Sequence, residues 1–445
     1  MFQTLKNAWR VPELKSKILF TLLIIVVYRL GSVIPVPFVD SALITAQGNA
    51  LSGTIFDYMS FLSGQAFVTG TLFALSVSPY ITSSIVMQLL TIAIPALERM
   101  AKEGEEGKKK IAAITRVVTV ALALITAFGY TQLLKSGFGT GSTFLTNDGI
   151  FAQIVIIACY CAGASLIMWL AERINEHGIG NGISMILFAN IVSGIPALLG
   201  SVWKMMFDKM GKFQVWPGLV LAVVSIAITL AIVVMVVWFT ESERRIPIQY
   251  AKRQVGRKMY GGQASHLPLK MNMAGVMPII FASSIVSIPA TIAGFIPNSG
   301  FATWVDKWLG VNSWIYLVIY IVLILLFSYF YIMISFNPIE VSNNIRSQGG
   351  AVPGIRPGKP TADYIARILR KITTIGAVFL IFVAAFPMVV NNISVIIAEK
   401  TSNEIVFTGL AFGGTSLLIV VGVALETFRA LEAQLSMRNY KGFLD

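Results

Sequence analysis

The chain has 445 residues, of which 56% are hydrophobic and only 12% are charged, and its mean hydropathy is +0.77. Soluble globular domains carry about 25% charged residues, so the composition excludes a soluble enzyme, a secreted disulfide scaffold and a disordered chain. The charges are nevertheless unbalanced, because 34 Lys and Arg residues face 21 Asp and Glu residues, giving a net charge of +13. A polytopic membrane protein remains, and its excess of positive charge needs an explanation.

Apolar segments of the length that crosses a bilayer recur along the whole sequence. About 20 apolar residues are needed to cross ~30 Å of hydrocarbon. Ten segments meet this requirement, and we predict spans at residues 18–36, 67–97, 111–134, 150–171, 183–203, 215–239, 272–297, 313–336, 370–393 and 405–428. They leave no room for a soluble domain, so the predicted fold is an all-α polytopic membrane protein.

The distribution of charge predicts the orientation of these spans. If the N-terminus is cytoplasmic, 27 of the Lys and Arg residues and 14 of the acidic residues fall in or beside cytoplasmic loops. The cytoplasmic side then carries the entire +13, as the positive-inside rule requires.

Ten spans divide into five and five, residues 1–205 and 206–445, with opposite orientations. Two halves of this kind are typical of an inverted repeat, and the interface between such repeats commonly contains the transport pathway.

Charged residues are nearly absent from the predicted spans. Arg29 alone falls well within one, and we expect its side chain to snorkel toward the outer surface. An ion-coupled transporter normally needs deep carboxylates, so that alternative ranks second. No residue pattern indicates catalysis or metal binding: both histidines fall in predicted cytoplasmic loops, and no Walker A spacing is present. We therefore expect no enzymatic activity, no cofactor and no metal, and energy supplied by a partner.

A short apolar stretch follows the first span. Residues 55–62 are apolar on most faces, and Thr54 with Asp57 forms a capping pattern that opens a short helix. Such a helix is too short to cross a bilayer. It is either a re-entrant segment beside a watery cavity or an amphipathic helix on the outer surface, and the spacing does not decide between these alternatives.

Two long cytoplasmic loops concentrate the basic residues. Residues 241–260, between spans six and seven, alternate around Ile246, Ile248 and Tyr250, which predicts a strand or hairpin. Basic residues interleaved with tyrosines suit RNA phosphates or an acidic protein face, although membrane anchoring alone is the alternative. The loop between spans eight and nine is dense in Gly and Pro over residues 349–360, which predicts a fixed turn that presents Arg356 and Lys359.

Taken together, these features resemble the SecY family, the central subunit of the bacterial protein-conducting translocon. The resemblance covers essentially the whole chain. It is carried by the motifs at residues 35–37, 79–85, 178–184, 250–254, 274–284, 353–358 and 412–419. It implies two inverted five-helix halves around a pore that opens sideways between spans two and seven. It also implies a protein-conducting function in the cytoplasmic membrane, with both termini cytoplasmic.

The resemblance further implies roles for individual residues. A re-entrant plug would comprise Ile55, Phe56, Asp57, Tyr58, Met59, Ser60, Phe61, Leu62, Ser63 and Gly64. A ring of aliphatic side chains at the constriction would comprise Val77, Ile81, Ile183, Leu187, Ile280 and Ile419. Two pairs in this ring have i,i+4 spacing, so each pair faces one direction. Family rings are usually rich in isoleucine, and Val77 and Leu187 depart from that pattern.

Polar residues at the lateral seam and basic residues in the loops complete the expected sites. The lateral gate would use Gln88, Asn181, Ser283 and Ser284. Partner docking would use Arg244, Arg245, Lys252, Arg253, Arg257, Lys258, Arg356 and Lys359. The expected partners are the SecE and SecG small subunits, the SecA motor ATPase, the ribosome, polypeptides that bear signal sequences, and membrane lipid. An insertase or scaffold without a pore is a further alternative.

Overall fold

The structure is a computed structural model of the chain. It describes residues 2–47, 60, 63–137, 143–207, 215–250, 253–255, 258–260, 264–296, 299–310, 313–401 and 414–441. Helices dominate it, and the strands all fall between residues 243 and 351.

The helices follow the order of the predicted spans. The first seven described are α1 (Phe2–Arg10), α2 (Pro12–Gly31), α3 (Ser41–Gln47), α5 (Ala66–Thr69), α6 (Ser78–Ala93), α7 (Pro95–Lys102) and α8 (Glu105–Lys135). The next are α9 (Ile150–His177), α10 (Gly182–Phe207), α11 (Val215–Glu241), α12 (Met277–Phe295) and α13 (Gly300–Leu309). The last are α14 (Trp314–Ser335), α15 (Pro338–Ser347), α16 (Lys359–Thr401) and α18 (Gly414–Lys441).

Each of the ten predicted spans overlaps one of these helices. Among the described residues, four helical stretches are long and apolar enough to cross a membrane by length and composition, namely α8, α9, Trp314–Ser347 (α14 with α15) and Lys359–Val390 of α16. Together, α6 and α7 would make a fifth. The fold class is thus confirmed, whereas the full count of ten membrane-spanning helices stays a prediction.

The second predicted span, residues 67–97, is wrong as a continuous helix. Residues 70–77 are turns, α6 begins only at Ser78, and α6 and α7 are bent by 100° at a break between them. Prolines cause both changes, because Pro79 lies in the first turn of α6 and Pro95 begins α7. Pro95 also disfavours helical backbone at Ile94, which is extended.

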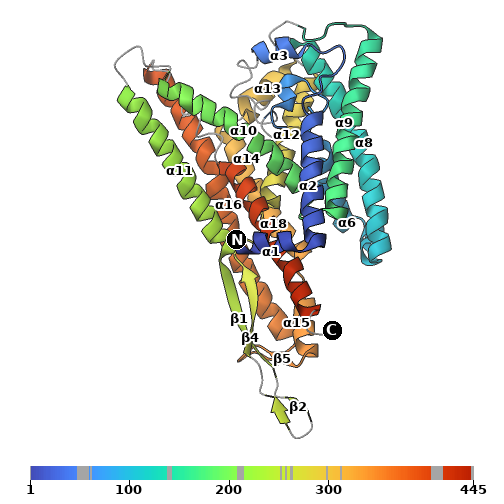
Figure 1. Ribbon diagram of the computed structural model, residues 1–445, viewed down its shortest axis with the longest axis vertical. Coiled ribbons are helices and arrows are strands. Elements are labelled where there is room, and N and C mark those ends of the chain that lie inside the picture. The colour runs from blue at the N-terminus through green and yellow to red at the C-terminus, as the bar shows by residue number, and fades with distance from the viewer. Residues whose placement is uncertain are drawn as a thin grey trace.

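The helices stand side by side around a shared apolar interior. Figure 1 shows α8 and α9 at one side of the bundle and α11 and α16 at the other, with α10, α12 and α18 between them. The largest buried cluster draws side chains from α2, α6, α9, α10, α11, α12, α14, α16 and α18. Large apolar side chains such as Val117, Val318 and Trp238 are instead exposed, as expected of helices in contact with lipid.

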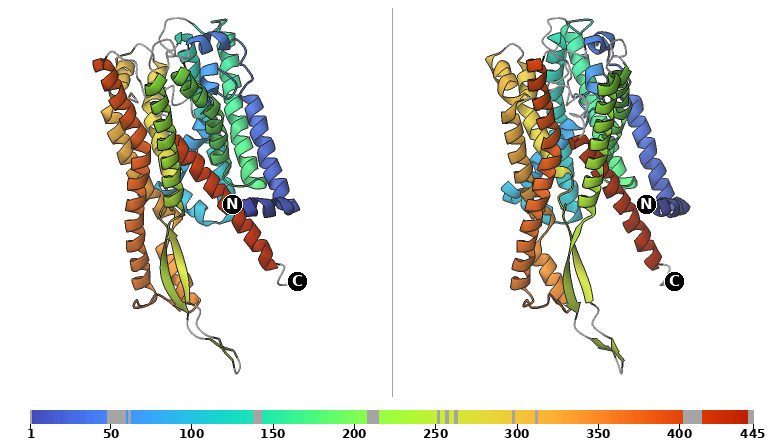
Figure 2. Two further views of the ribbon diagram at one scale, coloured as in Figure 1. Left: turned by 60° about the vertical axis from the view of Figure 1, so that its left-hand side comes forward. Right: turned by 90° about the vertical axis from the view of Figure 1, so that its left-hand side faces the viewer.

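A small sheet projects from one end of the bundle, beside α15 and the adjoining end of α16 (Figures 1 and 2). It consists of β1 (Glu243–Tyr250), β4 (Ala264–Lys270) and β5 (Gly350–Ala351), with β1 in the centre and antiparallel to both neighbours. A separate pair, β2 (Arg253–Val255) and β3 (Lys258–Tyr260), continues beyond it. The hairpin predicted between spans six and seven is confirmed.

The sheet is anchored on one face only. Ile246 and Ile248 on β1 are buried, while the residues between and before them are exposed. The buried pair packs with Ile345 of α15 and Ile365 of α16 in a cluster of its own. Because β5 lies between α14 and α16 and pairs with β1, the two long loops that were predicted to be cytoplasmic form one structural unit.

Candidate functional site

The six side chains expected at the constriction come together in the interior of the bundle. Val77 precedes α6 and Ile81 lies one turn into it, Ile183 and Leu187 lie on α10, Ile280 lies on α12, and Ile419 lies on α18. All except Ile183 are buried members of one cluster, and Ile183, half-buried, packs against it. We call these six residues the collar.

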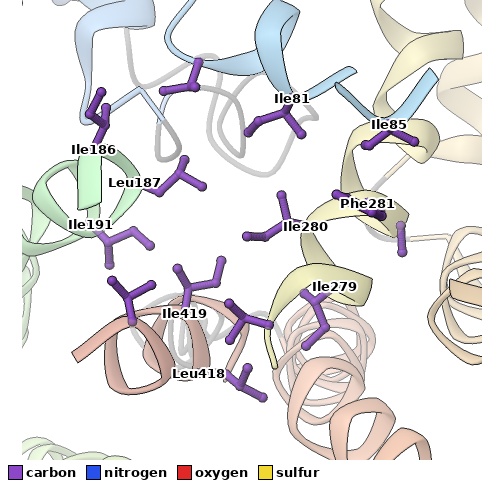
Figure 3. Close-up of a cluster of buried hydrophobic side chains, with 14 of the residues drawn as sticks. Ile81, Ile85, Ile186, Leu187, Ile191, Ile279, Ile280, Phe281, Leu418 and Ile419 are labelled. Atoms are coloured by element: carbon purple, nitrogen blue, oxygen red, sulfur yellow. The ribbon is translucent and has the colours of Figure 1, made fainter. Parts of the chain in front are cut away.

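Four collar side chains approach one another from four different helices. Figure 3 shows Ile81, Leu187, Ile280 and Ile419 pointing toward a common space. The positions are set locally: Pro79 lies in the first turn of α6, two residues after Val77, and Pro278 lies in the first turn of α12, two residues before Ile280. The collar therefore brings α6 and α10 together with α12 and α18.

Neighbouring aliphatic residues extend the collar and were not expected from the sequence. Ile85, Ile186, Ile191, Ile279 and Leu418 are buried in the same cluster and flank the collar in Figure 3. Aliphatic pairs at i,i+4 occur on every apolar helix, so spacing gives no signal that separates these residues from ordinary core.

A cavity of about 260 Å³ lies beside the collar, between α6 and α8 on one side and α12 on the other. Seven hydroxyl-bearing residues of these helices line it, and five of them donate to a carbonyl of their own helix: Thr82, Thr126, Ser284, Ser287 and Thr291. These five hydroxyls are thus satisfied within single helices, whereas Tyr130 donates to the carbonyl of Phe67. The wall that faces the seam is largely apolar.

The four residues expected at the lateral gate have different environments. Ser283 is buried and Ser284 half-buried, and both donate to the Ile280 carbonyl at 2.9 and 2.8 Å, respectively, rather than to a second helix. Gln88 on α6 is exposed. Asn181 accepts from the backbone N–H of Ile183 at 3.0 Å, so it caps the start of α10. Bonds of the two serines across the seam, which the sequence suggested, are therefore absent from this arrangement.

The segment of residues 63–77, which leads to the collar, is held by buried side chains from other helices. Tyr130 on α8 donates to the carbonyl of Phe67, and Tyr160 on α9 donates to the carbonyl of Gly70 at 3.1 Å. The two rings lie edge to face with centroids 5.0 Å apart. Nothing in the sequence marked these tyrosines, because their partners are backbone atoms 63 and 90 residues away.

Most of the expected plug lies outside the described residues. Ile55, Phe56, Asp57, Tyr58, Met59, Phe61 and Leu62 belong to that part of the chain. Of the remaining members, Ser60 and Ser63 are buried, and the Ser63 hydroxyl donates to the Ser60 carbonyl at 2.9 Å. Gly64 follows with a positive φ of 63°.

Basic residues expected to dock a partner occupy the projecting sheet and the neighbouring turn. Arg244 and Arg245 on β1 are exposed, and Arg245 is paired with Glu243 at 2.7 Å. Arg253 and Lys258 lie in β2 and β3, respectively. Lys252 and Arg257 lie outside the described residues.

The predicted turn between α15 and α16 is fixed by backbone contacts. Gly354 and Gly358 have φ values of 79° and 101°, which favour glycine. The Ser342 hydroxyl donates to the Gly358 carbonyl and the Thr361 hydroxyl donates to the Arg356 carbonyl, both at 2.8 Å. The side chains of Arg356 and Lys359 are exposed, so a rigid backbone presents both charges to solvent.

A second cavity, of about 250 Å³, lies where β4, α11 and α18 meet α12. Lys270, Glu426 and Arg429 line it. Burial lowers the pKa of the Lys270 ammonium, and the Arg429 guanidinium lowers it further. Arg429 also donates to the Thr240 carbonyl at 3.0 Å, which ties α18 to the end of α11. Charged groups thus gather between the collar and the sheet.

Comparisons with known proteins agree with the family that these motifs suggested. The family model described as SecY matches residues 71–428. The protein translocase subunit SecY of Streptomyces galbus is 42% identical, and that of Bacillus licheniformis is 39% identical, each over 100% of both chains.

Solved structures share the fold at lower sequence identity. The structure titled as that of a protein conducting channel has a TM-score of 0.65 at 17% identity. Sec61 in the canine ribosome-channel complex from the endoplasmic reticulum has a TM-score of 0.62 at 16% identity. Both likenesses cover 96% of this chain and 96% of the other. From its sequence and its fold, the chain belongs to the SecY family of protein translocase subunits.

Proposed function

We propose that the collar is the constriction through which this translocase subunit conducts unfolded polypeptides across the cytoplasmic membrane. The observation that carries the proposal is the convergence of Ile81, Leu187, Ile280 and Ile419 on a common space from four helices, with Val77 and Ile183 in or against the same cluster. A narrow apolar constriction stays dry and so excludes ions. Since none of the six side chains carries a polar group, the collar can widen around a passing chain without breaking hydrogen bonds.

The seam between α6 and α12 is the proposed lateral exit for hydrophobic segments. Two observations support it, namely the cavity between these helices and the internal bonding of the seam hydroxyls. Interhelical hydrogen bonds in membranes average about 0.6 kcal/mol, so a seam that lacks even these presents little polar cost to opening. Gln88 and Asn181 keep their proposed gate roles, with Asn181 acting through the start of α10.

Residues 55–64 are proposed as a plug that seals the outer side of the resting channel. The burial of Ser60 and Ser63 and the tight turn at Gly64 support this role. Deleting residues 55–63 is expected to raise the resting ion conductance of the channel in planar bilayers. An unchanged resting conductance would contradict the plug.

The projecting sheet and the adjoining turn are the proposed landing site for a driving partner. Either SecA or a translating ribosome fits an exposed basic surface of this kind, with SecE and SecG small subunits beside the bundle. The distribution of charge supports a cytoplasmic location for both loops and for both termini. Arg356→Glu is expected to abolish partner-driven translocation while leaving the resting channel unchanged, and a fully active variant would contradict docking at this tip.

We further propose that residues 1–205 and 206–445 are the two halves that part during transport, since the collar draws residues from both. Reconstitution of the purified subunit with its small subunits, SecA, ATP and a secretory precursor tests the function as a whole. Uptake of the precursor's soluble domain into vesicles is expected. An ion-coupled transporter would instead move a small solute without SecA, and an insertase would integrate hydrophobic segments without translocating that domain.

A further inference from the structure

Arg29 does not reach for the outer surface, as its place in the first predicted span suggested. It lies two residues before the end of α2, and its guanidinium points toward α10. Nη2 donates to the backbone carbonyl of Ala189 at 2.6 Å and also to the hydroxyl of Ser193. The predicted snorkelling did not anticipate these two acceptors on a neighbouring helix, which hold the half-buried guanidinium.

The same guanidinium lies against the turn at Gly64. A Cβ added at this glycine would come within 2.9 Å of Arg29 Nη2 and 3.0 Å of Nη1, and within 3.1 Å of the Asn190 side-chain oxygen. Gly64 also has a positive φ, so both its conformation and its surroundings require glycine. The turn, α2 and α10 therefore meet at Arg29.

The turn itself is tightly bonded. The backbone N–H of Gln65 donates to the Ser60 carbonyl at 2.7 Å, and the N–H of Phe67 donates to the Ser63 hydroxyl at 3.0 Å. Gln65 has a φ of 70°, an uncommon conformation for a residue with a side chain. Displacement of the turn would thus disturb the whole segment that leads from Ser63 to the collar.

Buried residues next to Arg29 and Ala189 contact the segment of residues 63–77 a second time, near its end at Val77. Tyr28 stacks on Phe73 with ring centroids 5.3 Å apart. Asn190 donates to the Ser76 hydroxyl at 3.3 Å, and Ser76 immediately precedes collar residue Val77. Ser76 also has a positive φ of 51°. Strained residues of this kind persist where the surroundings over-determine them, often at functional sites.

Arg29 is therefore connected to two parts of the collar. On α10, Ala189 lies two residues beyond Leu187, and in the segment 63–77 the turn and Ser76 lead to Val77. Its described partners are neutral: a carbonyl, a hydroxyl and the face of the Tyr28 ring. Arginine suits such a junction because its planar group offers five donors in a fixed geometry.

We propose that Arg29 is a positioning residue that fastens the turn at residues 63–65 to α10 and so fixes the spacing between Val77 and Leu187 in the resting channel. The proposal rests on the collar being the constriction. It adds a residue outside the collar that determines how tightly the collar closes. A charged side chain at membrane depth is costly, and this role accounts for its presence.

The test combines resting ion conductance with a measurement of spacing that does not depend on transport. Val77→Cys and Leu187→Cys are introduced together in a background in which Cys159 and Cys161 are replaced by serine. The yield of crosslinking by a short bifunctional thiol reagent then reports their spacing. Arg29→Met, Arg29→Lys and Gly64→Ala are compared, with Lys135→Met at the exposed end of α8 as the matched loss of a charge.

Arg29→Met is expected to raise resting conductance about fivefold, the effect of losing one hydrogen-bonded contact on a sealed-to-leaky equilibrium, and to lower the crosslinking yield. Gly64→Ala should do the same, Arg29→Lys should restore part of both, and Lys135→Met should change neither. Unchanged conductance and crosslinking in Arg29→Met would overturn the proposal, and if that variant does not fold, Gly64→Ala decides by the same criteria.

The two readouts separate this proposal from the function on which it rests. Lower crosslinking with unchanged conductance would keep Arg29 as a positioning residue and refute the collar as the seal. Unchanged crosslinking with raised conductance would refute the positioning role and leave the collar as the seal.

Discussion

Helix α6 has two contrasting faces, and the contrast shows how one protein can both hold together and open. Toward α8, the Ser83 hydroxyl donates to the Thr115 carbonyl at 2.8 Å, a polar bond between helices. Toward α12, Thr82 donates to its own helix, as do Ser284 and Ser287 on the opposing wall. Polar bonds thus join the elements that stay together. At the seam that is proposed to part, these three hydroxyls bond only within their own helices.

The largest effect, on resting ion conductance, is expected where an apolar side chain of the collar is replaced by a polar one. Ile280→Asn places an amide in the dry collar, where polar atoms attract water. A decrease of about 1.4 kcal/mol in the barrier to hydration would raise the resting ion leak about tenfold. Conductance in planar bilayers measures this, with Ile280→Val as the control that keeps the collar apolar. Equal leaks in the two variants would show that the collar is not the seal.

The next effect concerns a bond that holds the segment 63–77. Tyr130→Phe removes the side-chain donor to the Phe67 carbonyl, which then keeps only the long 3.4 Å bond from the backbone N–H of Gly70. The loss is expected to lower the free energy of unfolding by about 0.5–1.5 kcal/mol, the net contribution of one hydrogen bond. Thermal unfolding of the purified protein measures it. Tyr329→Phe, which removes an exposed hydrogen bond of 2.6 Å to the Thr374 hydroxyl, serves as the control, and equal stability of the two variants would contradict a holding role for Tyr130.

A smaller effect, on the rate of translocation, is expected from filling the cavity between α6, α8 and α12. Ser287→Leu adds apolar atoms to a wall of the 260 Å³ cavity and should stabilise the closed seam by about 1 kcal/mol, near the value for one buried methylene. Translocation of a precursor with a weak signal sequence should slow several-fold. Ser287→Ala removes the hydroxyl without filling the space and should leave the rate unchanged. Equal rates for Leu and Ala would argue that the seam does not open at this level.

The smallest effects, on the free energy of unfolding, compare the two faces of α6 directly. Ser83→Ala breaks an interhelical bond and should cost about 1 kcal/mol of stability. Ser284→Ala breaks only a bond within α12 and should change stability by less than about 0.5 kcal/mol. Thermal unfolding of both variants measures the difference, and a larger loss for Ser284→Ala would reverse the assignment of the two faces.

The sequence predicted much of this architecture because apolar length and charge are local properties. Each predicted span overlaps a helix, and the alternation around Ile246 and Ile248 correctly predicted a hairpin. The second span failed because two prolines interrupt a stretch whose composition stays apolar. Collar residues emerged only from the family motifs, since an aliphatic pair on one helix does not reveal its neighbours on three others.

Hydrogen bonds between distant segments could not be predicted from the sequence, for a different reason. The partners of Arg29, Tyr130 and Tyr160 are backbone carbonyls in other segments. A carbonyl is present at every position, so nothing in the residue types identifies the one that a side chain will reach.

The net charge of +13, by contrast, was informative early, because the loops that concentrate it form the projecting sheet and the exposed turn.

The central claim is that a translocating chain passes through the collar, and site-specific crosslinking tests it most directly. Ile81→Cys, Ile280→Cys and the exposed Val117→Cys are made singly in a background without Cys159 and Cys161, and a precursor is arrested midway through the channel. The account predicts disulfide or bifunctional crosslinks from positions 81 and 280 to the arrested chain, and none from position 117. Crosslinking from position 117 with none from the two collar positions would contradict it.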